Sequence, residues 1–249
     1  MGISKCDGCF SSINETQFWD RVMSFNNYSP DSTDNKLINA LGKVRNVQQA
    51  VNFGNISEED AGYLLTEHGE LTEHLINNKK LSPKLEHDMI EINQLMKMLP
   101  STNGTTLYRG VRNSVDRRFT DMLVNDFHKN SNILFKTSSY LSFSESPFIA
   151  KNYVIDSEGK MTKDGLLFVI EKSTDVPRAI SFYSPNPSEA EVLYPLGKYF
   201  KLTNATYLQL SKGSIWRVQI SEVEDINQYD NAMIFDFWGK PIRFLGGLL

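Results

Sequence analysis

A chain of 249 residues, 40% of them hydrophobic and 22% charged, can bury a large hydrophobic core, which excludes a disordered or fibrous protein. The formal net charge of −4 argues against a protein that coats nucleic acid. The acidic excess lies in the first 100 residues, so an anionic ligand is expected to bind to the remainder.

The N-terminus offers no clear metal site or targeting signal. Cys6 and Cys9 are the only cysteines, and a two-cysteine zinc or redox site needs partners that the sequence does not show, so we interpret them as incidental thiols. Asp7 and Gly8 interrupt any apolar leader, and no run approaches the ~18–20 apolar residues of a membrane span, so no stable membrane insertion is expected. Gly2 resembles an acylation site only weakly, because Cys6 stands where Ser or Thr is preferred.

Residues 1–100 have the pattern of a helical N-terminal region. Apolar residues at helical spacing predict helices over 18–25, 37–47, 57–71 and 82–99. Ser57, followed by three acidic residues, and the Ser82-Pro83 pair are typical helix starts, and Pro100 ends the last helix. The spacing of the three histidines in this region fits no metal motif, so we expect exposed helix positions for His68, His74 and His87.

At 101–105 the pattern changes to strands and turns, which places a domain boundary there and a second domain over 101–249. Short strands are predicted at 107–111, with Arg109 between apolar neighbours, and at 135–144, which is rich in hydroxyl groups. A helix is predicted at 115–128 and another after Ser146-Pro147. From the pattern alone, Arg109 can equally be an outward-facing strand residue.

The last hundred residues have the pattern of further strands. A continuous apolar run at 166–171 predicts a buried strand, and shorter runs at 199–202 and 215–220 predict two more. The apolar tail, 233–238 with 242–245, is interpreted as a last strand pair in preference to a partner-binding segment.

The most unusual stretch is 188–197, where two carboxylates precede an apolar strand. If the strand begins at Glu189, Glu189 and Glu191 lie on one face about 7 Å apart. Such a pair cannot pack into an apolar core, so it must face solvent, a cation or a site. The loop before it, 180–188, is rich in Ser, Pro and Asn and carries Phe182 and Tyr183.

Three motifs in order, Leu-Tyr-Arg-Gly-Val at 107–111, Tyr-Leu-Ser-Phe-Ser at 140–144 and Ser-Glu-Ala-Glu-Val-Leu-Tyr-Pro at 188–195, resemble the Arg-Ser-Glu class of mono-ADP-ribosyltransferases. This cholera-toxin-like group includes bacterial toxins and effectors. The resemblance covers about 104–220. It implies an α+β fold in which two mixed or antiparallel β-sheets pack face to face, preceded in the chain by the helical region 1–100. That region would be either the family's helical lobe over the NAD cleft or a partner-binding cap.

The resemblance assigns the first two motifs to NAD binding. Arg109 would bind the NAD phosphates, with Gly110 beside it, because a guanidinium matches a diphosphate bidentately. Ser142 would hydrogen-bond the nicotinamide–ribose region and orient the catalytic glutamate, and Ser144 would also lie at the cofactor. The family has threonine between these serines, and Phe143 stands there instead, which puts a role for the middle residue in doubt. Residues 137–139 offer a competing register.

The resemblance assigns the third motif to catalysis. Glu191 would stabilise the oxocarbenium-like transition state at the ribose, and Glu189 would position and deprotonate the acceptor. The Glu-x-Glu form is similar to the arginine-modifying subgroup, although some relatives use other acceptors. Phe182 or Tyr183 would be the exposed aromatic that touches the target. Arg109, Ser142, Glu189 and Glu191 are therefore the expected catalytic set.

The expected function is transfer of ADP-ribose from NAD, used as a substrate without a metal, to a target protein. Two alternatives stay open: an NAD glycohydrolase, in which water is the acceptor, and a degenerate module that binds NAD or a protein without turnover. The partner is expected to be a host protein and not a nucleic acid. The expected location is a host cytosol reached by a route without a signal peptide, with residence in the producing cell's cytoplasm as the alternative.

Overall fold

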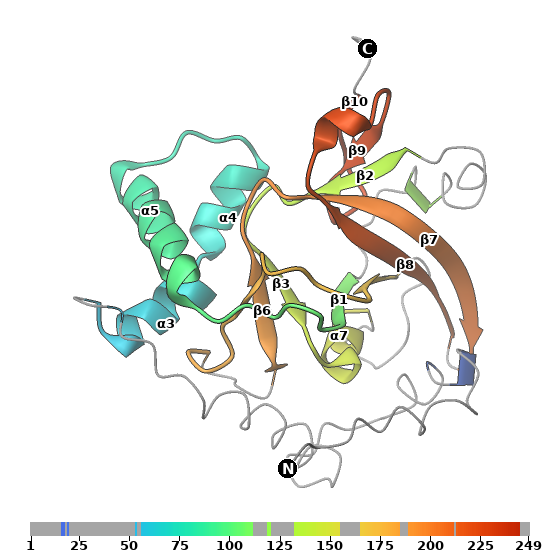
Figure 1. The fold of residues 1–249 in the computed structure, drawn as a ribbon, viewed down its shortest axis with the longest axis horizontal. Coiled ribbons are helices and arrows are strands. Elements are labelled where there is room, and N and C mark those ends of the chain that lie inside the picture. Colours follow the sequence, from blue (N-terminus) through green and yellow to red (C-terminus); the bar gives the residue numbers. More distant parts are fainter. Residues whose placement is uncertain are drawn as a thin grey trace, which may run out of the picture.

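The computed structural model describes residues 16, 17, 19, 53, 56–111, 119–120, 132–154, 165–184, 189–211 and 213–244. Within them, a group of helices is followed by a large β-sheet (Figure 1). The two cysteines, the predicted helix at 37–47 and most of those at 18–25 and 115–128 lie outside the described residues.

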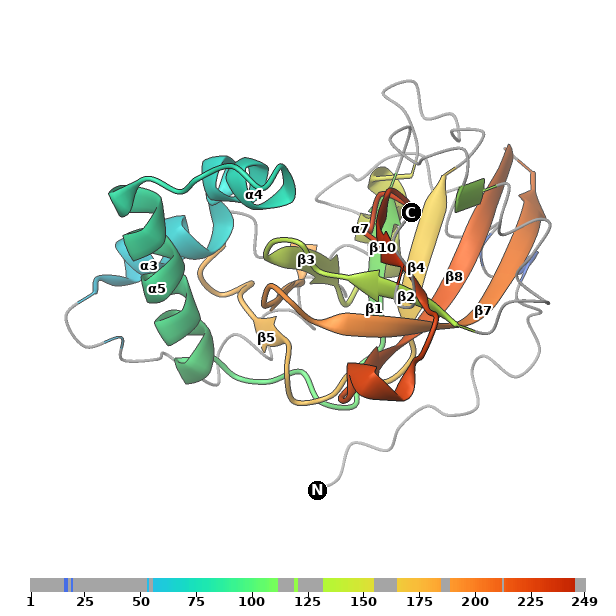
Figure 2. The same ribbon diagram turned by 90° about the horizontal axis from the view of Figure 1, so that it is seen from above.

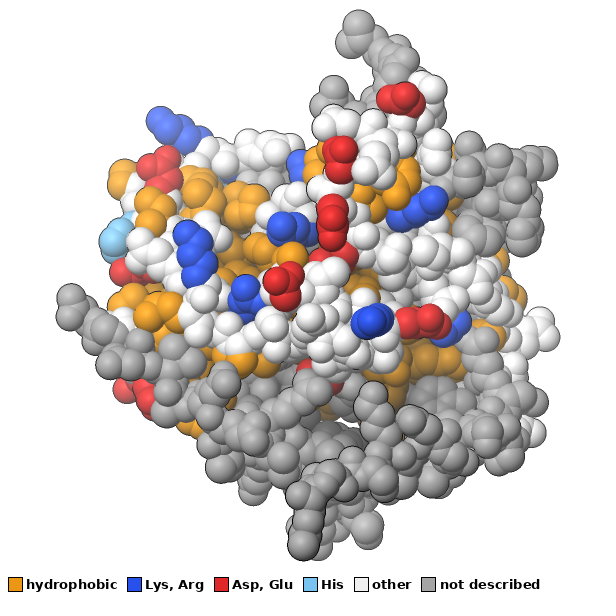
Figure 3. Space-filling view, in the orientation of Figure 1, with side chains coloured by type: hydrophobic (Ala, Val, Ile, Leu, Met, Phe, Trp, Pro, Cys, Tyr) orange, Lys and Arg blue, Asp and Glu red, His pale blue; other side chains and the backbone are white. Residues whose placement is uncertain are grey.

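Between residue 56 and the first strand the structure has the helices α3 (Glu58–Thr66), α4 (Gly69–Ile76) and α5 (Pro83–Met98). The Ser57 hydroxyl accepts the Asp60 N–H and the Ser82 hydroxyl accepts the Leu85 N–H, which confirms both predicted helix starts. These three helices form the lobe beside the sheet in Figure 1, and hydrophobic side chains gather over them on the face seen in Figure 3.

The prediction of one helix from 57 to 71 is wrong, because α3 ends at Thr66 and α4 begins at Gly69, a residue that weakly supports a helix. The prediction that His68 is an exposed helix residue is also wrong, because His68 lies at this junction as the N-cap of α4 and is half-buried. Its Nδ1 lies 3.2 Å from the Thr72 hydroxyl, its Nε2 is buried, and burial lowers the pKa of the imidazole. His74 and His87 lie on α4 and α5.

The strands begin with β1 (Leu107–Val111), β2 (Ile133–Lys136) and β3 (Leu141–Ser144), and the short helix α7 (Pro147–Asn152) follows β3. The single strand predicted over 135–144 is therefore wrong. Thr137 interrupts it: its hydroxyl donates to the Pro195 carbonyl at 2.9 Å, and its carbonyl accepts the Gly197 N–H at 2.7 Å. These bonds tie the 137–140 turn to the turn that follows Tyr194.

The remaining strands are β4 (Leu166–Ile170), β5 (Arg178–Ala179), β6 (Glu191–Tyr194), β7 (Tyr199–Leu210), β8 (Gly213–Val223), β9 (Met233–Phe235) and β10 (Pro241–Phe244), with a 3₁₀ turn, η2 (Ile226–Gln228), before β9. β7 and β8 form one long antiparallel hairpin that contains both of the shorter predicted strands. The antiparallel pairing of β9 with β10 confirms that the apolar tail is a strand pair.

The ten strands of the described residues are hydrogen-bonded in the order β10-β9-β2-β7-β8-β4-β1-β3-β6-β5. Rings from distant parts of this sheet nevertheless meet. The ring centres of Phe135 on β2 and Phe168 on β4 are 5.1 Å apart, and those of Phe143 on β3 and Phe237 in the β9–β10 turn are 5.8 Å apart. The two halves of the sheet thus pack face to face around an aromatic core and are joined through β8 and β4 (Figure 2). The predicted fold class is confirmed.

The helices share a second core with the sheet. Their buried side chains pack with Tyr140, Ile180 and Leu193, and the Tyr140 hydroxyl lies 2.8 Å from the Asn93 side-chain oxygen on α5. Arg178 of β5 donates from Nε to the Met96 carbonyl near the end of α5. In the described part of the chain, no helix has the length and apolar character needed to cross a bilayer.

Candidate active site

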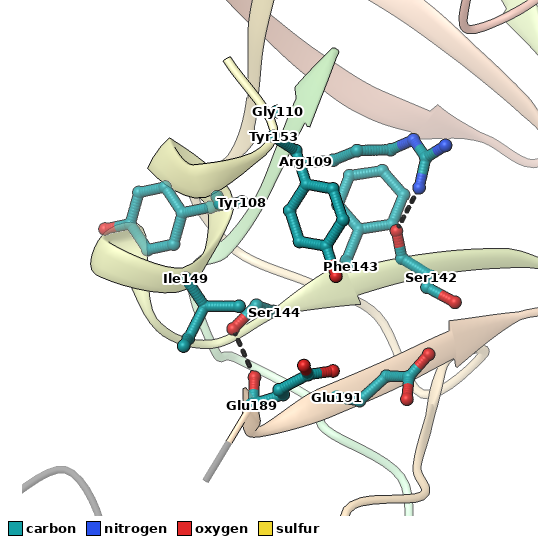
Figure 4. Close-up of a pocket in the computed structure, with 11 residues that line it drawn as sticks. Tyr108, Arg109, Gly110, Ser142, Phe143, Ser144, Ile149, Tyr153, Glu189 and Glu191 are labelled. Atoms are coloured by element: carbon teal, nitrogen blue, oxygen red, sulfur yellow. Dashed lines mark hydrogen bonds between the residues drawn. The ribbon is translucent and has the colours of Figure 1, made fainter. Parts of the chain in front are cut away.

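One recess gathers residues from β1, β3, α7 and the chain entering β6 (Figure 4). Its volume is about 340 Å³, and all three sequence motifs contribute to its wall. The lining residues are Tyr108, Arg109, Gly110, Ser142, Phe143, Ser144, Ile149, Ala150, Tyr153, Glu189 and Glu191. The structure therefore brings together every residue predicted to be catalytic or to bind NAD.

Arg109 lies at the back of the recess, where β1 runs between β3 and β4. Its Nη1 donates to the Ser142 carbonyl at 2.7 Å, which links the first motif directly to the second (Figure 4). Its buried Nε has no hydrogen-bond partner among the described residues. Burial lowers the pKa of the guanidinium to about 10, against the opposing pull of Tyr153 and Glu191, so Arg109 is still cationic at neutral pH.

Gly110 allows α7 to cross close to β1. A Cβ atom at this position would lie 2.0 Å from the Ala150 carbonyl oxygen and 2.8 Å from a methyl carbon of Val154. A side chain is therefore excluded by packing, which is a reason for glycine that does not depend on a ligand. A contact between Gly110 and NAD stays a prediction.

Ser142 and Glu191 are diagonal neighbours on the paired strands β3 and β6, where Ser144 is directly opposite Glu191, and the Ser142 side chain hydrogen-bonds the Glu191 carboxylate (Figure 4). Burial raises the pKa of the Glu191 carboxyl, and the nearby Glu189 raises it further. The hydrogen bond from Ser142 and the charge of Arg109 act in the opposite direction and favour the carboxylate. Phe143, where the family has threonine, packs in the core with its ring centre 5.2 Å from that of Tyr194, and it also contributes to the wall of the recess.

Ser144 supports the backbone that carries Glu189. Its hydroxyl donates to the Glu189 carbonyl at 2.6 Å and accepts the Ser146 N–H at 2.9 Å. Glu145 N–H also donates to the Ala190 carbonyl at 3.1 Å. The protein thus already uses the Ser144 hydroxyl as donor and acceptor, and a contact with NAD stays a prediction.

The conditional prediction that the strand begins at Glu189 is wrong, because β6 begins at Glu191. Ala190 has a φ of +46°, a left-handed conformation that ends the pleat between the two glutamates. Both carboxylates nevertheless point into the recess (Figure 4), and burial raises the pKa of Glu189 as well.

The two aromatic residues of the preceding loop differ in exposure. Phe182 is 40% exposed, whereas Tyr183 is half-buried and its ring centre lies 4.8 Å from that of Phe53. Of the two predicted target-contacting residues, Phe182 is therefore the one available to a partner. Residues 185–188 of the loop lie outside the described residues.

Sequence reasoning missed three aromatic residues at the site. Tyr108 and Tyr153 line the recess, and Trp238 lies against Arg109, with 5.5 Å between the guanidinium carbon and the indole centre. Tyr108 directly precedes Arg109, and this adjacency was the only available signal. No local sequence signal marks Tyr153 or Trp238, because the fold brings them to the site from the end of α7 and from the β9–β10 turn.

No cluster of three or more His, Cys, Asp or Glu side chains able to hold a metal ion occurs among the described residues. The recess places a guanidinium beside two carboxylates and a serine hydroxyl. The guanidinium fits a diphosphate, and the orphaned Nε shows hydrogen-bonding capacity that the described residues do not satisfy.

No protein-family model matches the chain, and no curated protein sequence matches it. Solved structures do. The Vis toxin, an ADP-ribosyltransferase from Vibrio splendidus, superposes with a TM-score of 0.60 at 16% identity over 90% of this chain and 99% of that chain. The structure of Vis in complex with agmatine superposes with a TM-score of 0.61 at 16% identity, over 89% of this chain and 99% of that chain.

Two further bacterial enzymes have the same architecture. Plx2a, an ADP-ribosyltransferase toxin from Paenibacillus larvae, gives a TM-score of 0.55 at 13% identity over 77% of this chain and 97% of that chain. An ADP-ribosyltransferase from Clostridium botulinum gives a TM-score of 0.52 at 12% identity over 78% of this chain and 99% of that chain. The chain therefore has the fold of bacterial ADP-ribosyltransferase toxins, as its motifs predict.

Proposed function

We propose that the protein is a mono-ADP-ribosyltransferase that transfers ADP-ribose from NAD to a side chain of a target protein and releases nicotinamide. The observation that carries the proposal is the convergence of Arg109, Ser142 and Glu191 on one recess, from three segments far apart in sequence. The ADP-ribosyltransferase fold of the chain supports the same activity.

In the proposed reaction, Arg109 binds the NAD diphosphate, and Glu191 stabilises the positive charge that develops on the ribose as its bond to nicotinamide breaks. The bonding electrons leave with nicotinamide. The acceptor nitrogen then forms a bond to the same ribose carbon and loses a proton. Ser142 serves the reaction by holding the Glu191 carboxylate and, through its carbonyl, Arg109.

We assign acceptor deprotonation to Glu189 and infer an arginine acceptor. A guanidinium is protonated in water, so it needs a carboxylate that binds the cation and accepts a proton. Glu189 lies in the recess beside Glu191, and its raised pKa makes it a better base than an exposed carboxylate. The structural neighbour Vis has been solved with agmatine, a small guanidinium compound, which supports this inference.

The proposed biological role is that of a toxin or effector delivered into a host cell. Structural neighbours described as toxins support it. A host protein is then the acceptor, and Phe182, exposed in the loop that leads to the two glutamates, is proposed to contact it.

Labelled NAD with agmatine as acceptor tests the reaction. The wild-type protein should release nicotinamide and label agmatine. Glu191→Gln should reduce both by at least about 100-fold, whereas Glu189→Gln should abolish labelling but leave slow release to water. Glu86→Gln, an exposed position on α5, is the matched control.

Two results would contradict the proposal. Nicotinamide release that is unaffected by Glu189→Gln, with no labelled agmatine or lysate protein, identifies an NAD glycohydrolase. NAD binding without nicotinamide release, in the presence of lysate, identifies a binding module. Mass spectrometry of a labelled lysate protein then identifies the modified side chain.

A further inference from the structure

Arg109 has a neighbour that none of the three motifs includes. Trp238 lies in the turn between β9 and β10, about 130 residues away in sequence, and its indole faces the Arg109 guanidinium at 5.5 Å. A guanidinium over an aromatic ring is attracted to it and tends to be held in a defined plane.

The turn that carries Trp238 is rigidly built. The buried Asp236 accepts the Trp238 N–H at 2.9 Å and the Lys240 N–H at 2.8 Å through the same carboxylate oxygen. Gly239 has a φ of +78°, and a Cβ there would lie 3.0 Å from Phe119. The left-handed backbone and the tight contact both favour glycine at position 239, and the Asp236 carboxylate holds the backbone of Trp238 in the turn.

The Ser142 carbonyl and the Trp238 indole contact different parts of the Arg109 guanidinium. The Ser142 carbonyl fixes one edge of the guanidinium through Nη1, and the indole lies against one face. The buried Nε has no hydrogen-bond partner among the described residues. A flexible arginine would lose conformational entropy on binding a diphosphate, and one held in advance would lose less.

We propose that Trp238 is a positioning residue that holds the Arg109 guanidinium in the plane required for bidentate binding of the NAD diphosphate. This inference rests on the proposed function and extends it to the C-terminal hairpin. It makes the last strand pair part of the NAD-binding apparatus, although Trp238 itself does not touch the reacting atoms.

The test is NAD affinity, measured by calorimetry on proteins that also carry Glu191→Gln so that NAD is not consumed. Trp238→Ala should weaken binding about 10-fold. Trp238→Phe, which keeps an aromatic face, should retain most of the affinity, and Trp238→Leu, which keeps only apolar bulk, should not. Trp216→Phe is the control, because Trp216 packs on Tyr207 in the β7–β8 hairpin.

A double variant separates positioning from general damage. In a protein that already carries Arg109→Ala, Trp238→Ala should weaken NAD binding no further, because the indole acts through the arginine. With Glu191 intact, Trp238→Leu should raise KM for NAD more than it lowers kcat. If Trp238→Ala fails to fold, the NAD affinities of Trp238→Phe and Trp238→Leu decide whether the aromatic face is required.

Three outcomes would overturn the inference. Equal NAD affinity of the Trp238→Leu variant and its Glu191→Gln parent, or additive losses in the Arg109→Ala background, would refute the role of Trp238 and leave the proposed function standing. Absence of NAD binding by the Glu191→Gln parent and the wild type would refute both.

Discussion

In the proposed reaction, Glu191 acts as a carboxylate in surroundings that disfavour a negative charge. Burial and the neighbouring Glu189 raise the pKa of its carboxyl, while the Ser142 hydrogen bond and the Arg109 charge lower it. The environment therefore leaves the carboxylate poorly solvated in the wall of the recess. A charge held in this way interacts strongly with a developing cation, because water does not screen it.

These opposing influences predict the pH dependence of the proposed reaction. The rate of nicotinamide release should fall on acidification at a pH above the ordinary pKa of glutamate, as Glu191 becomes protonated. Glu189→Gln removes a negative neighbour, so it should lower the pKa of Glu191 and move the acidic limb to lower pH. Ser142→Ala removes a stabilising hydrogen bond and should move the limb to higher pH.

The measurement is kcat/KM for nicotinamide release against pH for the wild type and both variants. The opposite directions are the decisive feature, because a general loss of activity would not move the limb. Shifts of the same sign in both variants, or no shift in either, would refute the assignment of the limb to Glu191.

The same burial predicts a gain in stability when the charge is removed. A carboxyl whose folded-state pKa lies above its unfolded value binds its proton more tightly in the folded state, so ionisation costs stability at neutral pH. Glu191→Gln should therefore raise Tm at pH 7 while abolishing activity. The gain should disappear as pH falls below the ordinary pKa of glutamate. Thermal melts at several pH values test this, with Glu86→Gln as the exposed control, and a lower Tm at pH 7 would contradict it.

At the scale of elements, the site depends on how closely α7 crosses β1. The crossing places Tyr153 and Ile149 in the wall of the recess, and Gly110 permits it. A side chain at position 110 would force either the helix or the strand to move. The glycine of the first motif thus has a structural explanation that is complete without NAD.

Gly110→Ala should lower the free energy of unfolding by at least about 1–3 kcal/mol, because the added methyl group would overlap the Ala150 carbonyl. The matched control is Gly69→Ala at the start of α4, where a Cβ meets nothing within 4 Å and alanine improves helix propensity. Urea denaturation of both variants gives the comparison. Equal stability of Gly110→Ala and the wild type would show that α7 can move away without cost.

Local sequence signals explain which elements could be predicted. Ser57 and Ser82 cap their helices as expected, and the apolar runs at 107–111 and 166–171 are strands, because caps and burial are encoded within a few residues. The break at Thr137 and the left-handed Ala190 were not predictable in this way. Thr137 is held by the turn after β6, about 60 residues away. Ala190 is held by Glu145, about 45 residues away.

At the scale of the whole molecule, the motif order predicted that Arg109, Ser142, Glu189 and Glu191 would meet, and the sheet order explains why. β1 pairs with β3, and β3 pairs with β6, so the three motifs lie on adjacent strands or at their ends. Trp238 could not be predicted, because the β9–β10 turn reaches Arg109 through packing of the two sheet halves and not through strand pairing.

The domain division predicted at residue 100 remains to be tested, and the shared core makes a specific prediction about it. Tyr140, Ile180 and Leu193 of the sheet region are buried together with the side chains of α3 and α5. Separating the two parts would expose this apolar surface on both. We therefore expect the helices and the sheet to be held together by burial even when the chain between them is cut.

A protease site introduced at the exposed Asn103–Gly104 turn tests this expectation. After cleavage, the two fragments should co-elute in gel filtration and unfold in one urea transition, because the helices stay seated on Tyr140 and its neighbours. The uncut protein with the same insertion is the control. Dissociation of the fragments without denaturant would show that the helical part is an independent domain. The position of Tyr183, which packs beside Phe53 and Gly62, would then not depend on the helices.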